Sequence, residues 1–96
     1  MVFDNLSGGS TIIKVYPGVS ASPGDTKYNG TFNSGENVTA ICKTKGRRVM
    51  SDPQLGELAR TSDYWIRVIG TPNTVQYATA VYVKDSDTLL AKLPDC

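Results

Sequence analysis

Hydrophobic and polar positions alternate along most of this chain in short runs, and turn-forming residues separate one run from the next. The runs are rich in Val, Ile, Thr and Tyr, which favour β-strands over helices. They are TIIKVY (11–16), KYNGTF (27–32), NVTAICK (37–43), DYWIRVIG (63–70) and VQYATAVYV (75–83). This pattern predicts an all-β fold, a small barrel or sandwich of roughly five to six short strands with long loops.

Alternation within each run assigns side chains to an inner or an outer face, because successive residues of a strand point to opposite sides. In TIIKVY it turns Ile13 and Val15 to one face and Tyr16 to the other. In NVTAICK it turns Val38 and Cys42 to the same side, which we expect to be the inner one.

The run DYWIRVIG contains the only tryptophan of the chain. Its β-branched residues Ile66 and Val68 form the better inner face. We therefore expect Trp65 and Arg67 on the outer face, away from the core.

The segments between the runs are expected to be loops and turns. PGVSASPGD (17–25) predicts a loop, and KTKGRR (43–48) a hairpin turn. VMSDPQLGELART (49–61) predicts a long hairpin excursion, with a helical turn as the alternative. KDSDTLLAKLPDC (84–96) is expected to wrap back over the strands. We expect residues 1–10 to be a flexible N-terminal segment.

The 96 residues allow one domain with a modest core. The net charge of +1 provides no global field for nucleic acid, and the basic cluster 43–48 has no interleaved aromatics, so we expect no nucleic-acid partner. The chain lacks an apolar stretch long enough for a membrane span, so we expect no membrane insertion. We also expect a monomer.

The absence of histidine removes several kinds of catalytic and metal chemistry at once. A carboxylate pair such as Asp63 with Glu57 or Asp85 could in principle serve glycoside hydrolysis, but nothing in the spacing selects one pair. Asp85 and Asp87 resemble half of a calcium loop without its glycine and its distant glutamate. We therefore expect no catalysis, no metal site and no cofactor.

The two cysteines allow two interpretations. A disulfide between Cys42 and Cys96 would tie down the C-terminal residues and disfavour the unfolded chain by roughly 4 kcal/mol on the loop-entropy account. The alternative is a free, buried Cys42 and a mobile Cys96. The disulfide, which we favour, indicates an oxidising location outside the cytoplasm, with any signal peptide already removed.

Several of these fragments, in their order along the chain, resemble the bacterial SH3 family (SH3b), in particular its secreted actinobacterial versions. VYPGVS (15–20) is similar to that family's opening VRSGPS, and GTFNSGENVTAIC (30–42) to its GTLxxGxxVxVxC. SDYWIRV (62–68) is similar to its tryptophan strand, and QYATAVYV (76–83) resembles its GYVSxxYV element, which holds a 3₁₀ turn. A cysteine after LPD resembles the ending APxC of the secreted members.

The chain departs from this family pattern at several positions. Tyr16 replaces the usual arginine, Gln76 the usual glycine before the tyrosine-valine element, and Val75 another frequent glycine. The segment GRRVMSDPQLGELART (46–61) is longer than the usual hairpin connection. These departures fall where a ligand preference would be set.

The resemblance implies an SH3-like barrel that acts as a non-catalytic secreted or cell-wall module and binds peptidoglycan or peptide segments. The ligand-binding residues that we expect are Tyr16, Trp65, Arg67, Tyr77 and Tyr82. Flat apolar rings with polar tips suit peptides and sugar rings. The alternative is that these aromatic residues only cap the ends of a small core.

A secreted interaction or inhibitor protein that binds one protein partner is the second interpretation of function. A flat apolar patch including Ile12, Ile41 and Ile69 would favour it. The segment DTLLAKL (87–93) could instead fold back over these isoleucines and remove the patch.

Overall fold

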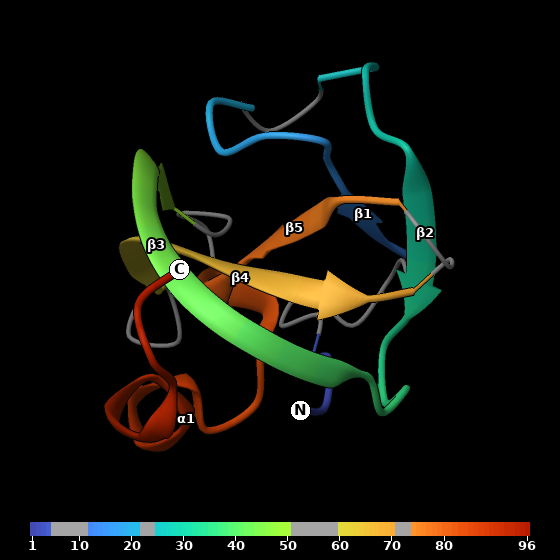
Figure 1. Cartoon of the computed structure of the whole chain (residues 1–96). Coiled ribbons are helices and arrows are strands. Elements are labelled where there is room, and N and C mark those ends of the chain that lie inside the picture. Colours follow the sequence, from blue (N-terminus) through green and yellow to red (C-terminus); the bar gives the residue numbers. More distant parts are fainter. Residues whose placement is uncertain (5–11, 22–24, 51–59, 71–73) are drawn as a thin grey trace.

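A computed structural model of the chain describes residues 1–4, 12–21, 25–50, 60–70 and 74–96 (Figure 1). Its strands are β1 (Ile12–Val15), β2 (Gly30–Asn33), β3 (Thr39–Met50), β4 (Thr61–Ile69) and β5 (Gln76–Thr79). A 3₁₀ turn (Ala80–Tyr82) and the helix α1 (Ser86–Lys92) follow β5. The described chain is thus mostly β, as the sequence predicts, with one α-helix that the sequence did not predict.

The strands form two antiparallel sheets. One pairs β1 with β2, and the other has the order β3-β4-β5. A single antiparallel bridge between Tyr16 and Tyr77 joins the end of β1 to β5. The described strands do not close into one barrel.

The first residues of the chain belong to this framework. Val2 bridges to Asn37 and Phe3 to Val83, so the segment 1–4 lies between two distant parts of the chain. Phe3 is 1% exposed and stacks on Phe32 at 5.3 Å between ring centroids. The expected flexible segment is therefore wrong for residues 1–4, and residues 5–10 lie outside the described residues.

The basic stretch 43–48 is part of the long strand β3, and the expected turn is wrong. Two irregularities in the pairing of β3 with β4, one of them between Lys45 and Val49, take up the extra residues. The N–H of Arg47 donates to the backbone oxygen of Val19 at 2.7 Å, which binds the loop after β1 to the outer edge of β3. β3 therefore bends around the molecule instead of turning back (Figure 1).

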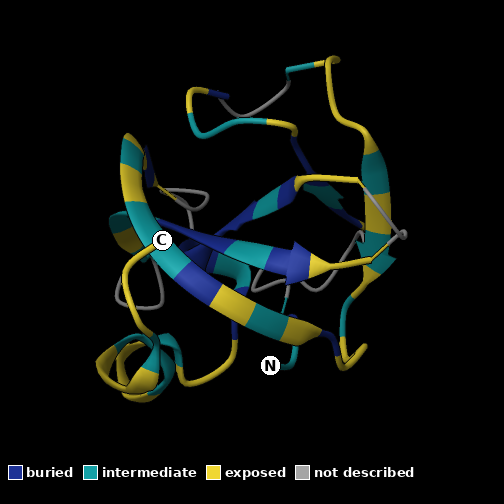
Figure 2. Cartoon of the chain, viewed as in Figure 1, coloured by how far each residue is buried: buried dark blue, intermediate teal, exposed yellow. Residues whose placement is uncertain are grey.

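Figure 2 shows which parts of the chain are buried. The buried residues form two clusters. The first core consists of Phe3, Ile13, Val15, Val38, Ile66, Val68, Ala78, Ala80 and Val83. The second core consists of Tyr16, Ala21, Val49, Trp65 and Val81. The inner positions that alternation predicts in β1 and β4 are confirmed, and Cys42 is buried at 7% exposure.

The outward orientation expected for Trp65 is wrong. Its side chain is 1% exposed, and Tyr16, also expected outside, is 8% exposed. β4 is the central strand of its sheet and is covered on both faces, so consecutive residues Trp65 and Ile66 enter different cores. Val49 and Ala21 supply the cover over Trp65, and neither is near it in the sequence.

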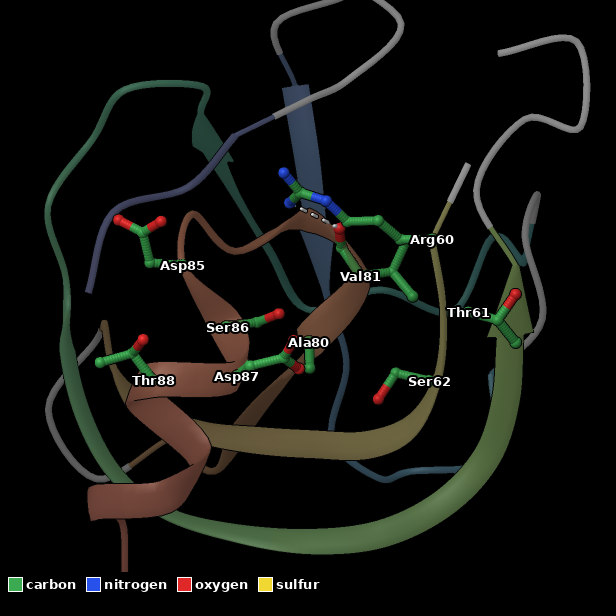
Figure 3. Close-up of a pocket in the computed structure, with 9 residues that line it drawn as sticks. All are labelled: Arg60, Thr61, Ser62, Ala80, Val81, Asp85, Ser86, Asp87 and Thr88. Atoms are coloured by element: carbon green, nitrogen blue, oxygen red, sulfur yellow. Dashed lines mark hydrogen bonds between the residues drawn. The ribbon is translucent and has the colours of Figure 1, made fainter. Parts of the chain in front are cut away.

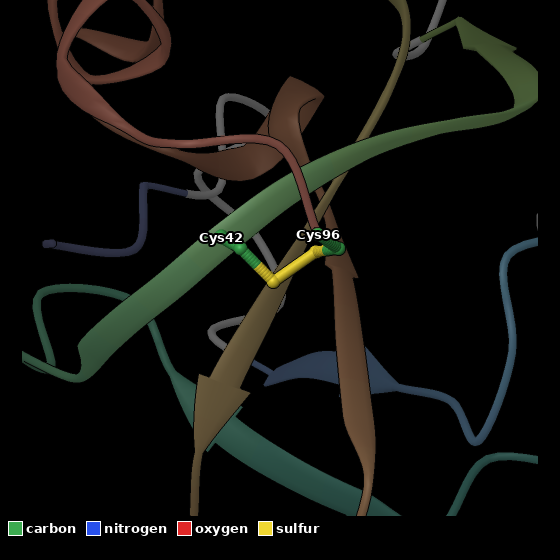
Figure 4. Close-up of a disulfide and its surroundings, with 2 residues drawn as sticks. All are labelled: Cys42 and Cys96. Atoms are coloured by element: carbon green, nitrogen blue, oxygen red, sulfur yellow. A yellow bond between two sulfur atoms is a disulfide. The ribbon is translucent and has the colours of Figure 1, made fainter.

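The C-terminal segment folds back as a helix. Asp87 in its first turn and Lys92 in its last turn complement the helix dipole. Three leucines of this C-terminal segment pack against the first core: Leu89, Leu90 and Leu93. Figure 4 shows the disulfide between Cys42 and Cys96, which confirms the favoured pairing.

The outer isoleucines stay uncovered by α1. Ile12 is 54% exposed, Ile41 38% and Ile69 56%. The helical turn weighed for residues 53–60 falls almost entirely outside the described residues.

Candidate functional site

Four of the five predicted ligand-binding residues come together around the second core. Tyr16 and Trp65 belong to it, and the half-buried Tyr77 and Tyr82 pack against it. We call these four side chains the aromatic cluster. They come from the end of β1, from β4, from β5 and from the 3₁₀ turn, which are distant in sequence.

Trp65 is the base of the aromatic cluster. Its Nε1–H donates to the backbone oxygen of Arg47 at 3.0 Å, which satisfies the one polar atom of a buried ring. Tyr16 meets it edge to face, with 6.1 Å between ring centroids and an interplanar angle of 82°. Both rings are held from several sides, so they are the fixed part of the aromatic cluster.

Tyr77 and Tyr82 form the outer part of the aromatic cluster. The backbone of Tyr77 exchanges two hydrogen bonds with that of Tyr16, at 2.9 and 2.7 Å. Thr79 caps the 3₁₀ turn, where its Oγ1 accepts from the N–H of Val81 at 3.3 Å. This cap fixes the turn that carries Tyr82, whose ring packs against both cores.

A polar rim lies beside the ring of Tyr16. Its hydroxyl donates to the backbone oxygen of Asp25 at 3.5 Å. Burial raises the pKa of this phenol, and the nearby charges of Asp25, Tyr82 and Tyr28 raise it further. Tyr28 is 43% exposed and has the ammonium of Lys14 5.0 Å from its ring centroid.

Tyr28 was not among the predicted site residues. In the sequence it is only an aromatic residue within the short run 27–32. Its position near Tyr16 follows from the folding of the loop after β1. Arg67, the fifth predicted residue, is half-buried on β4 and pairs in register with Tyr77. It therefore flanks the aromatic cluster.

A separate polar hollow of about 430 Å³ lies between the start of β4, the 3₁₀ turn and the beginning of α1 (Figure 3). Arg60 reaches into it and donates from Nη1 to the backbone oxygens of Val83 at 3.1 Å and Val81 at 3.5 Å. Its Nη2 lies 3.6 Å from a carboxylate oxygen of Asp4. Arg60 thus fastens the N-terminal segment to the 3₁₀ turn, which is a structural role.

Asp85 and Asp87 line the same hollow, whereas Asp63 does not. In the described parts of the chain no group of three or more His, Cys, Asp or Glu side chains could hold a metal ion. None of the described helices is both long and apolar enough to cross a membrane.

In comparisons with protein-family models, curated proteins and solved structures, the chain matches none of them. The fold and the site define a small, mostly β protein with one disulfide and an aromatic cluster at its second core. Its function is therefore argued from these features.

Proposed function

We propose that this protein is a secreted, non-catalytic binding module with an SH3b-like fold, whose aromatic cluster recognises cell-wall peptidoglycan or peptide segments. The observation that carries the proposal is the convergence of Tyr16, Trp65, Tyr77 and Tyr82 around one cluster. Side chains from four separate elements meet there, and the outer ones remain partly accessible.

The aromatic cluster combines a rigid base with partly exposed rings. Trp65 and Tyr16 are buried and fix the positions of their neighbours, while Tyr77, Tyr82 and the exposed Tyr28 offer ring faces and hydroxyl groups. Rigid tyrosines supply contact area at low entropic cost and can hydrogen-bond through their tips. This combination suits sugar rings and extended peptides.

The order of the elements supports the SH3b-like part of the proposal. The 3₁₀ turn at Ala80–Tyr82 directly follows β5, within the segment that resembles the family's tyrosine-valine element. The disulfide is compatible with a location outside the cytoplasm, which supports secretion.

A pull-down of the oxidised protein on purified bacterial cell wall, whole and stripped of teichoic acid, tests the proposal. We expect binding to both preparations, and a loss of about tenfold in affinity for Tyr77→Ala, since one interface aromatic contributes roughly 1–2 kcal/mol. The matched control is Tyr64→Ala. Tyr64 is also a half-buried strand tyrosine, but it packs against the first core.

Equal losses in both variants would contradict the assignment of the site, and absence of binding to either wall would contradict the ligand class. Binding that disappears only on stripping would indicate that the ligand is the anionic polymer. The basic stretch 43–48 of β3 would then be the place to look for the site.

A protein partner is the second candidate function, and the uncovered isoleucines favour it. Ile12, Ile41 and Ile69 are each more than a third exposed, and α1 packs elsewhere. If this surface binds a protein, Ile41→Ser combined with Ile69→Ser will abolish capture of a defined partner from culture supernatant. The Tyr77→Ala variant will retain it.

A further inference from the structure

The C-terminal segment Asp85–Cys96, which we call the strap, is fastened to the rest of the molecule at two adjacent residues of β3. Cys42 forms the disulfide with Cys96. The backbone of Lys43 donates to the oxygen of Pro94 at 2.9 Å and accepts from the N–H of Cys96 at 2.9 Å. These bonds make Pro94–Cys96 a short parallel neighbour of β3.

The side chain of Lys43 adds a further bond. Its ammonium donates to the backbone oxygen of Leu90 at 2.5 Å, in the last part of α1. A cation there complements both an unpaired carbonyl and the negative end of the helix dipole. Backbone, side chain and disulfide therefore all hold the strap at Cys42 and Lys43.

The strap contributes little to the interior. None of the residues of α1 is buried, and every member of the two cores lies between residues 3 and 83. A helix of seven residues is too short to be stable alone in water. Both cores are therefore made without a buried residue from the strap, whose contribution is the packing of Leu89, Leu90 and Leu93 against the first core.

A strained joint connects the strap to the body. Asp85 has φ of 53° and is the only non-glycine with positive φ in the described chain. This conformation is unfavourable for a residue with a side chain, and the Asp85 side chain makes no capping bond that would offset it. Release of the strap lets this residue relax, which favours opening at this position.

We propose that the strap is a thiol-operated latch, closed by the Cys42–Cys96 disulfide and opened by its reduction while the β body stays folded. Cys96 is exposed and Cys42 is 7% exposed, so a thiolate of a dithiol reductant attacks the sulfur of Cys96. Cys42 leaves as a thiolate and takes up a proton. The second thiol of the reductant then resolves the mixed disulfide, so the reductant becomes a disulfide and both cysteines become thiols.

Opening exposes the apolar side of Leu89, Leu90 and Leu93 together with the edge of β3 at Lys43. The leucines pack against the first core, and of the aromatic cluster only Tyr82 contacts that core as well as the second. The latch therefore does not depend on the function proposed above.

Amide hydrogen exchange measured by NMR on the oxidised and the dithiothreitol-reduced protein tests the latch. We expect the amides of Lys43, Leu93 and Cys96 to exchange about tenfold faster or more after reduction. Lys43 and Cys96 lose acceptors across the contact that opens, and Leu93 loses its bond to Leu89 when the short helix unfolds. The amide of Tyr77, bonded to Tyr16 within the body, should keep its protection. Unchanged protection at the strap would overturn the proposal, and so would loss of protection at Tyr77 together with the strap.

A pair of lysine variants provides a second test in the oxidised protein. Lys43 and Lys45 both lie over the ring of Tyr64, at 6.0 and 5.6 Å, but only Lys43 bonds to Leu90. Lys43→Met should therefore be reduced by dithiothreitol several-fold faster than the unchanged protein, and Lys45→Met at the unchanged rate. Equal rates in the two variants would show that Lys43 does not hold the strap. The double variant Cys42→Ser with Cys96→Ser should reproduce the exchange pattern of the reduced protein.

Discussion

The two cores lie on opposite faces of β4 and are built from different side chains. The first core is mainly aliphatic, and Ile66 and Val68 enter it from β4. The second core is built around two aromatic rings, and Trp65 enters it one residue earlier. Aliphatic side chains only fill space, whereas tyrosine and tryptophan carry a polar atom that must find a partner. An aromatic core can therefore be interior packing and the base of a surface site at once.

Removal of the Trp65 ring should give the largest effect, because it deletes the centre of the second core. Trp65→Ala is expected to lower the free energy of unfolding by about 3–5 kcal/mol, from lost burial and the cavity that remains. Ile66→Val, its neighbour in the first core, should cost only about 1 kcal/mol. Urea denaturation followed by circular dichroism measures both. A cost below about 1 kcal/mol for Trp65→Ala would contradict the burial of this ring.

A smaller change tests the second core alone, because it acts on a residue that packs against this core. A Cβ on Gly46 would overlap the backbone oxygen and the Cβ of Val19, whose side chain packs against the second core. Gly46→Ala should therefore cost about 1–3 kcal/mol and displace the loop after β1. Gly18 in that loop has open space around it, so Gly18→Ala should change stability by less than about 0.5 kcal/mol. Equal costs would mean that the loop is not seated on β3.

The polar atoms of the two regions also differ in how well they are satisfied. The indole N–H of Trp65 has its partner, but Oε1 of the buried Gln76, beside the first core, has none among the described residues. Its Nε2 donates to the oxygen of Asn29 at 3.1 Å. Gln76→Met removes the unpaired oxygen at similar volume, so we expect stability between unchanged and about 1 kcal/mol higher. Gln76→Glu buries a charge and should cost about 3 kcal/mol or more. A large loss in the methionine variant would show that the bond to Asn29 outweighs the unpaired atom.

The weakest effect concerns pH. The pKa of Tyr16 is raised above its ordinary value of 10.0 in the folded protein, first by burial and then by Asp25. The neutral phenol therefore contributes fully below pH 10, and its contribution is lost as the pH rises through the raised folded pKa. Stability should fall above pH 10, and Tyr16→Phe should fall less steeply over the same range. Identical slopes in urea titrations of the two proteins would contradict the burial of this hydroxyl.

The parts of the fold that alternation predicted are those covered on one side only. Ile13 and Val15 follow the period of two because their strand presents one face to the interior. Cys42 is buried but does not follow it, because the irregularity after Ala40 places Ala40 opposite Val68 and Cys42 opposite Arg67, on the other face. Trp65 departs from the alternation because segments distant in sequence cover the second face of β4. The sequence of a single strand contains no information about these segments. The stretch 43–48 extends β3 because a bulge absorbs its extra residues.

The sequence named four aromatic residues that come together in the structure, but it did not predict their arrangement. Tyr16, Trp65, Tyr77 and Tyr82 do meet, but which rings face inward depends on the cover from the loop after β1. Tyr28 was not predicted, because its position beside Tyr16 depends on how that loop folds. Local periodicity carries no information on such a contact.

A titration of the isotopically labelled, oxidised protein with soluble muropeptides, followed residue by residue by NMR, tests the central claim most directly. If the outer rings of the aromatic cluster bind the ligand, shifts will concentrate at Tyr28, Tyr77 and Tyr82. Shifts confined to the exposed isoleucines Ile41 and Ile69, or no shifts at any concentration, would contradict the claim.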